Sequence, residues 1–217
     1  MASRARRKDA TCITGKCPRG TQVECLEIVQ NIEDCCVLLQ QTKKVLFCEY
    51  VEGKNYHYWL QFHADTVPLV VCNLEGYAQK YCPQWEGRKS DYLLVGREKN
   101  ECYIIVIELR EQFTQQKQLS DKIEQLKQSI ENITLHILPH LSRLQKFQEA
   151  CFFETAQINY KIVGIAMPVV RSMRRVKQTK QPFSINNYEA QIVNIPQTCI
   201  KNCQLTWTDL LNELQNS

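Results

Sequence analysis

The feature that most constrains the fold of this sequence is an unbroken apolar run from Cys102 to Ile107, which continues through Glu108 to Leu109. Isoleucine and valine dominate the run, and β-branched residues favour strands. A strand that lacks polar alternation is typical of one buried on both faces. We therefore predict that residues 102–109 form a central strand of a sheet that is covered on both sides.

A long helix is predicted after this strand. Apolar residues recur at spacings of 4, 3, 4, 3 and 4, in a stripe that continues less regularly to Phe147: Leu119, Ile123, Leu126, Ile130, Ile133 and Ile137. Such a stripe fits a helix packed on a sheet and also a coiled-coil seam. The preceding strand favours packing on the sheet, and the Leu119–Phe147 helix stays a candidate surface for a protein partner or a second copy. Pro139 is expected to kink or divide the helix.

The other segments predict a mixture of helices and strands. We expect a helix at 21–41, a hairpin of strands 44–51 and 56–62, strands at 68–72, 90–95 and 160–167, a loop at 73–89, an edge strand at 190–195 and a helix that begins after Thr206. This order predicts an α/β (α+β) fold with a mixed central β-sheet flanked by helices and one long helix after the central strand.

The chain length fits one domain made of four segments. These are a basic irregular arm at 1–20, a helix and β-hairpin at 21–66, a core at 67–170, and a basic segment, edge strand and C-terminal helix at 171–217.

Positive charge is concentrated in two segments, although the net charge is only +4. The first eight residues carry four cations, and a frayed tail is the preferred explanation for them. Residues 155–188 contain no acidic residue, and clustered cations of this kind bind nucleic-acid backbones. A solvated surface loop is the alternative. The candidate nucleic-acid contacts in this second segment are Arg171, Arg174, Arg175, Lys177 and Lys180.

Cysteine usage and the absence of an apolar leader predict a cytoplasmic protein with no membrane span. A short organelle transit peptide is the alternative for the basic start. Most of the 12 cysteines are then expected to be thiols. The spacings Cys12-x4-Cys17-x7-Cys25 and Cys199-x3-Cys203 are looser than those of structural zinc sites, so the sequence disfavours zinc.

Two acidic residues stand where adjacent predicted strands begin and end. Asp91 lies at the start of strand 90–95, and Glu108 lies near the end of strand 102–109. On antiparallel neighbours these carboxylates can meet at one end of the sheet. With the Leu109 carbonyl they would suit Mg²⁺ or Mn²⁺. Arg110 follows Glu108 by two residues, so its cation would lie on the same face of the sheet.

This arrangement resembles the PD-(D/E)xK, or restriction-endonuclease-like, nuclease superfamily. The matching residues are Ser90-Asp91 before a strand, Glu108-Leu109-Arg110 at the end of the next, and Gln125-Leu126 on the following helix. The strand at 160–167 fits the next element of that pattern, so the resemblance covers roughly residues 69 to 170.

The resemblance implies a metal-dependent nuclease that acts on DNA or RNA phosphodiesters, in a restriction, repair, transposition or CRISPR-linked setting. Asp91 and Glu108 would bind the metal, Arg110 would steady the phosphate, and Gln125 would support the site. The sequence departs from the family where Arg110 replaces the catalytic lysine. Lys122 on the following helix is a candidate substitute. The alternative is an inactive nuclease-fold subunit that binds nucleic acid or partner proteins in a larger complex.

Overall fold

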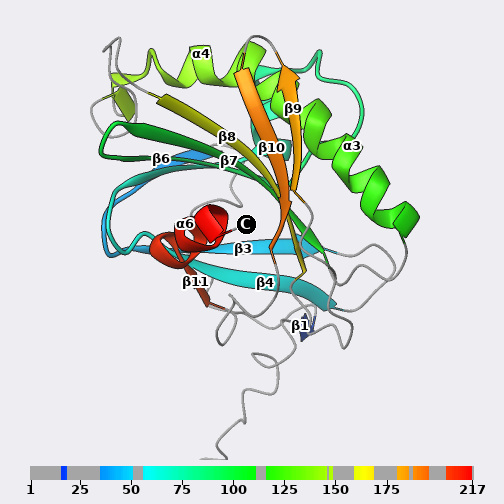
Figure 1. Ribbon diagram of the computed structural model, residues 1–217, viewed down its shortest axis with the longest axis horizontal. Helices are drawn as coiled ribbons and strands as arrows, with labels where there is room; N and C mark the ends of the chain where they lie inside the picture. Colours follow the sequence, from blue (N-terminus) through cyan, green and yellow to red (C-terminus); the bar gives the residue numbers. More distant parts are fainter. Residues whose placement is uncertain are drawn as a thin grey trace, which may run out of the picture.

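The computed structural model describes residues 16–18, 35–50, 56–110, 116–145, 147–148, 159–168, 180–185, 188–195 and 204–216. In these residues the chain has a mixed α+β fold built on a large seven-stranded sheet (Figure 1). Its strands, in spatial order, are β2 (Cys36–Leu39), β5 (Leu69–Asn73), β6 (Tyr92–Glu98), β7 (Glu101–Arg110), β8 (Asn159–Pro168), β10 (Tyr188–Asn194) and β9 (Lys180–Ile185).

The large sheet changes from antiparallel to parallel at its centre. Strands β2, β5, β6 and β7 pair antiparallel, β7 pairs parallel with β8, and β8 pairs parallel with β10. The outer strand β9 returns antiparallel to β10. A parallel pair needs a crossover connection, and the long helix lies in the segment between β7 and β8. The predicted central position of the apolar strand is confirmed, since β7 is the fourth strand of the seven.

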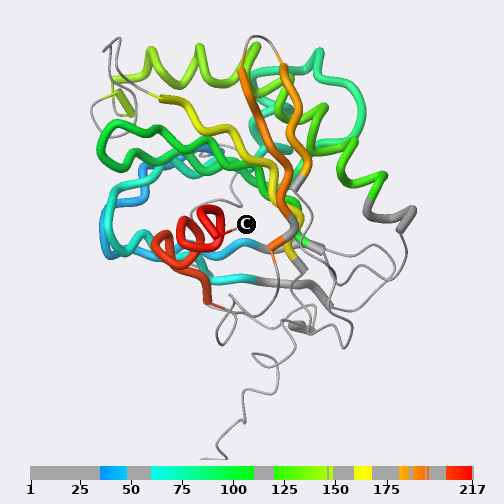
Figure 2. Tube along the Cα trace, in the orientation of Figure 1, coloured from blue at the N-terminus to red at the C-terminus, as the bar shows by residue number. Residues whose placement is uncertain are grey.

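A smaller sheet forms from both ends of the chain. Its strands are β1 (Lys16–Pro18), β3 (Lys44–Tyr50), β4 (Tyr56–His63) and β11 (Gln204–Thr206). β3 and β4 form the predicted antiparallel hairpin, and β11 pairs parallel with β4. Residues about 140 positions apart thus meet in one sheet, as the colours of Figure 2 make visible.

Helices cover one face of the large sheet. They are α2 (Leu74–Tyr81), α3 (Gln116–Asn132), the π-helical turn η3 (Ile133–Ile137) and α4 (Leu138–Leu141). The π turn stands immediately before Pro139, where the sequence predicted a kink or a division, and Leu138 N–H bonds to the carbonyl of Ile133. The last helix, α6 (Trp207–Asn216), lies with the small sheet on the opposite side (Figure 1). Its predicted cap is present, because Thr206 Oγ1 accepts from Asp209 N–H at 2.9 Å.

Two apolar clusters form on the two faces of the large sheet. Alternate residues of β7 point to opposite sides: Cys102, Ile104 and Val106 join the cluster under the helices. Tyr103, Ile105 and Ile107 join the cluster under the small sheet and α6. The run is therefore apolar throughout because both of its faces are buried, as the sequence predicted.

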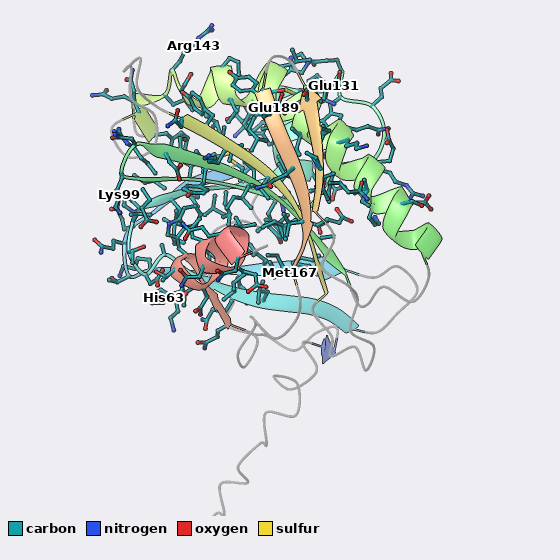
Figure 3. All side chains as sticks on the ribbon, in the orientation of Figure 1. His63, Lys99, Glu131, Arg143, Met167 and Glu189 are labelled. Carbon is teal, nitrogen blue, oxygen red and sulfur yellow. A yellow bond between two sulfur atoms is a disulfide. The ribbon has the colours of Figure 1, made fainter. Side chains whose placement is uncertain are left out.

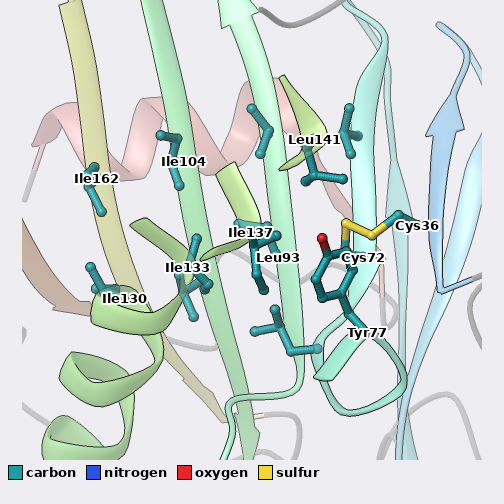
Figure 4. Packing of buried hydrophobic residues seen from close by; sticks show 14 of the residues in the cluster. Cys36, Cys72, Tyr77, Leu93, Ile104, Ile130, Ile133, Ile137, Leu141 and Ile162 are labelled. Carbon is teal, nitrogen blue, oxygen red and sulfur yellow. A yellow bond between two sulfur atoms is a disulfide. The ribbon is translucent and has the colours of Figure 1, made fainter. Parts of the chain in front are cut away.

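The apolar stripe of the long helix is buried in the first of these clusters. Ile123, Leu126, Ile130, Ile133 and Ile137 all pack there, and Figure 4 shows several of them against the sheet. A Cβ added to Gly164 of β8 would lie 3.3 Å from Ile130 Cδ1, so this glycine permits the close approach of α3. The prediction of packing on the sheet is confirmed.

Several predicted elements are wrong. A helix was expected at 21–41, but Cys36–Leu39 form strand β2 and pair with β5. Residues 21–34 lie outside the described residues. The loop expected at 73–89 contains helix α2, which Asn73 caps by accepting from Gly76 N–H at 2.9 Å. Part of the predicted irregular arm is strand β1.

The strand predicted at 190–195 is present, but its predicted edge position is wrong. It corresponds to β10, which is interior because β9 pairs along its other side. Strand β9 lacks a clear alternating pattern, and the sequence placed its first residue, Lys180, in the basic segment. Among the described helices none is both long and apolar enough to span a membrane.

Candidate active site

Asp91 and Glu108 come together at one end of the β6–β7 pair. Asp91 directly precedes β6, and its N–H donates to the carbonyl of Ile107 at 3.0 Å. Its Oδ2 accepts from the N–H of Leu109 at 2.6 Å. This N–H belongs to the peptide that joins Glu108 to Leu109, so the Asp91 carboxylate lies against the backbone of the second acidic residue.

The Glu108 side chain is buried beneath helix α3. Strand alternation directs it to the same side as Val106, towards the helices, and it is 1% exposed. Oε1 accepts from Lys122 Nζ at 2.8 Å, and Oε2 accepts from Gln125 Nε2 at 3.0 Å. Both carboxylate oxygens of Glu108 therefore have polar partners on α3.

Lys122, Gln125 and Ser129 form a polar stripe on α3. Their spacing of three and four residues places them on one face of the helix. Lys122 Nζ also donates to Gln125 Oε1 at 2.5 Å, so lysine, glutamine and glutamate form a closed triangle of contacts. We call Asp91, Glu108, Lys122 and Gln125 the acidic-end cluster.

Helix α3 also fixes the segment that leads into Asp91. Gln125 Nε2 donates to the carbonyl of Lys89, and Ser129 Oγ accepts from Ser90 N–H at 2.9 Å. On the other side, the Asp91 carbonyl accepts from Leu74 N–H of α2 at 3.0 Å. The backbone of Asp91 is thus held by α2 and β7 and, through the two residues before it, by α3. Tertiary contacts, rather than a local turn, hold it there.

The electrostatics of the cluster are those of a buried ion pair. The Lys122 side chain is 13% exposed and that of Glu108 is 1% exposed. Desolvating two such charges offsets much of their attraction, so the pair adds little net stability compared with apolar residues of the same shape. Removing one partner would leave the other charge buried and unpaired, which is strongly destabilising.

If the cluster held a metal, its two carboxylates would favour a hard divalent cation. Mg²⁺ is commonly held by one or two carboxylates, with water and substrate phosphates filling its other positions. Asp91 and Glu108 are two carboxylates at the same end of the strand pair, where Asp91 Oδ2 accepts from Leu109 N–H and both Glu108 oxygens accept from α3. In the part of the chain that the structure describes, no group of three or more His, Cys, Asp or Glu side chains could hold a metal ion.

Several predicted site residues lie partly or wholly outside the described residues. The backbone of Arg110 pairs with Pro168 at the end of the β7–β8 ladder, but the Arg110 side chain lies outside the described part of the structure. The same holds for the side chain of Lys180. Arg171, Arg174, Arg175 and Lys177 lie outside the described residues, as do Cys12, Cys25, Cys199 and Cys203.

Sequence reasoning undervalued Lys122 and missed Ser129. A signal for both existed, because Lys122-x2-Gln125-x3-Ser129 is a polar stripe next to the apolar stripe of the same helix. It was hard to use because helix surfaces carry many polar residues. Only the packing of α3 on β7 shows that this stripe faces Glu108 and the segment before Asp91.

Comparison with known proteins adds no relative. No protein-family model, no curated protein and no solved structure matches the chain.

Proposed function

We propose that this protein is a metal-dependent nuclease that hydrolyses DNA or RNA phosphodiesters at the acidic-end cluster. One observation carries the proposal: Glu108, Lys122 and Gln125 are joined by short side-chain contacts, and the Asp91 carboxylate accepts from the Leu109 N–H at the same end of the two adjacent strands. Clusters of carboxylates and a cation in a partly desolvated place are common at catalytic sites. The sequence resemblance to the PD-(D/E)xK superfamily supports the same chemistry.

Each residue has a proposed role. Asp91 and Glu108 would hold Mg²⁺ or Mn²⁺, which when bound supplies Lewis acidity for activating water and neutralising phosphate charge. Gln125 is a positioning residue, since it contacts Glu108, Lys122 and the carbonyl of Lys89. Its amide would keep the two catalytic side chains in register with the segment that carries Asp91.

Lys122 is the proposed replacement for the motif lysine, because this sequence has Arg110 at the motif position. Its ammonium lies 2.8 Å from Glu108 Oε1, although it comes from the helix and not from the strand. An ammonium is compact and its proton affinity can be tuned, whereas the guanidinium of Arg110 stays charged. Lys122 can therefore donate a hydrogen bond or a proton near the phosphate, which Arg110 does less readily.

The test is a cleavage assay with matched variants. Purified protein is incubated with Mg²⁺ or Mn²⁺ and a mixture of single- and double-stranded DNA and RNA. Glu108→Gln, assayed at a temperature where its circular dichroism matches that of the folded wild type, should lower the cleavage rate by about 100-fold or more, because it removes the charge that would hold the metal. Glu131→Gln is the control: Glu131 is an exposed carboxylate on the same helix, labelled in Figure 3, and should keep wild-type activity. Equal rates in the wild type and Glu108→Gln would overturn the proposal.

A second function is favoured by the same contacts. Both oxygens of Glu108 already have partners on α3, and Arg110 stands where the family has lysine. These observations suit a nuclease-fold subunit that binds nucleic acid without cutting it. Such a subunit should show no cleavage with either metal. Its affinity for a labelled oligonucleotide should fall steeply between about 50 and 200 mM salt.

A further inference from the structure

A disulfide joins the first two strands at one edge of the large sheet. Cys36 of β2 and Cys72 of β5 stand directly opposite each other in the antiparallel register, and their sulfurs are bonded. Figure 4 shows this bond beside Tyr77 of α2. The sequence predicted mostly thiols. The other cysteines with described side chains, Cys35, Cys82 and Cys102, are indeed buried thiols.

The bond lies where the sheet is easiest to open. β2 has only four residues and is the last strand on its side of the described sheet. Cys72 is fully buried, whereas Cys36 is 9% exposed. Short edge strands open by local fraying at a much lower free energy than global unfolding requires. A small reductant can therefore reach the Cys36 sulfur after β2 alone has frayed.

The bond is also close in structure to the segment that carries Asp91. Asn73 follows Cys72, and its N–H donates to the Cys35 carbonyl at 2.8 Å. Asn73 then caps α2, and the N–H of Leu74 donates to the Asp91 carbonyl at 3.0 Å. Only Asn73 thus separates Cys72 from Leu74, whose N–H makes the backbone contact to Asp91.

We propose that Cys36–Cys72 is a reversible redox site that controls how firmly β2 and the start of α2 are held against the sheet. The reductant is a dithiol. Its thiolate attacks Cys36 Sγ, which forms a mixed disulfide and releases the Cys72 thiolate to take up a proton. The second thiol of the reductant then closes its own disulfide and frees Cys36 as a thiol. Two electrons pass to the protein, and oxidation by a disulfide reverses the steps.

Reduction leaves β2 attached by its few backbone hydrogen bonds and side-chain contacts. In the oxidised form the disulfide closes a loop between cysteines 36 residues apart in sequence. This loop stabilises the fold mainly by lowering the conformational entropy of the unfolded chain. Its loss should lower Tm on the order of 5–10 °C for a chain of this size. It should also loosen Asn73 and Leu74 and, through them, the carbonyl contact to Asp91.

The experiment follows thiol state and amide exchange in the full chain, so it does not depend on nuclease activity. Folded protein is treated with dithiothreitol without denaturant. Free thiols are then alkylated, and the masses of the peptides that contain Cys36 and Cys72 are measured by mass spectrometry. Cys36 and Cys72 should both be recovered as blocked thiols, which shows that the bond is reduced in the folded protein. Amide exchange of Cys36–Leu39 should rise about tenfold or more, with a smaller rise at the start of α2.

Two variants provide the controls. Cys36→Ala should reproduce the exchange pattern of the reduced form without any reductant, and Cys102→Ala should leave the response to dithiothreitol as in the wild type. Three results would overturn the proposal: thiols at both positions in protein that was never reduced, a bond that yields only after denaturation, or reduction that leaves β2 exchange unchanged. Each is measured on the wild type, so the proposal stays testable if a variant fails to fold.

Discussion

The two ends of β7 carry the same pair of residue types in opposite environments. At its start, Glu101 pairs with Lys161 of β8 at 3.6 Å, and the two side chains are 37% and 50% exposed. Near its end, Glu108 pairs with Lys122 of α3 at 2.8 Å, and both are largely buried. The difference arises because α3 covers the end of the strand, whereas the start lies at the rim of the sheet.

The comparison separates an ordinary surface pair from one that stability alone does not explain. An exposed pair contributes roughly 0–1 kcal/mol and is screened by salt. A buried pair costs desolvation that apolar side chains avoid, so it is weak evidence for stability. The Glu101 pair therefore contributes little, and the Glu108 pair gives no net stability that apolar side chains of the same shape would lack.

The largest expected effect is on stability at the buried end. Lys122→Met removes the partner of a carboxylate that is 1% exposed, and should lower the free energy of unfolding by about 3–5 kcal/mol. Urea denaturation at neutral pH measures this loss. The double variant Glu108→Leu/Lys122→Met should recover most of it, because apolar residues of similar size need no desolvation. If the single and double variants lose equal stability, the pair is not the buried ion pair described above.

A smaller effect concerns pH at the exposed end. Tyr103 OH donates to Glu101 Oε2 at 2.5 Å, and burial, reinforced by this contact, raises the pKa of Tyr103 to about 12. An unfolded tyrosine ionises near about pH 10, so the unfolded chain loses this proton first as pH rises. The stability contributed by Tyr103 is therefore complete below about pH 10 and is lost between about pH 10 and 12.

Tyr103→Phe tests this sign. The variant should lose less stability than the wild type between about pH 10 and 12, as measured by urea midpoints over that range. Glu101→Gln should flatten the alkaline loss less, because burial, the larger cause of the raised pKa, remains. If the free energy of unfolding of Tyr103→Phe falls with pH as steeply as that of the wild type, another group dominates the alkaline transition.

The smallest expected effect is that of the exposed pair. A double-mutant cycle with Glu101→Gln and Lys161→Met should give a coupling energy of about 0.5 kcal/mol that vanishes in about 1 M salt. The same cycle with Glu108→Gln and Lys122→Met should give a larger coupling with little salt dependence. Equal couplings at the two ends would remove the contrast between them.

The site was only partly predictable from the sequence. Asp91 and Glu108 could be found because each stands at the end of a strand that its own residues define. Gln125 was singled out only through the family resemblance, and Lys122 only as a candidate substitute, since a helix turns a different side chain towards the sheet every few residues. Their role depends on the angle at which α3 crosses β7, which non-local packing sets.

The sequence by itself determined the elements whose burial pattern is local: the central strand, the hairpin, the capped terminal helix and the apolar stripe of α3. Only the tertiary structure decided that Cys36–Leu39 form a strand, that β10 is interior and that Cys36 meets Cys72. The physical reason is the same in each case. Strand pairing and disulfide bonds join residues far apart in sequence. Their stabilisation overrides the weak local preferences of short segments.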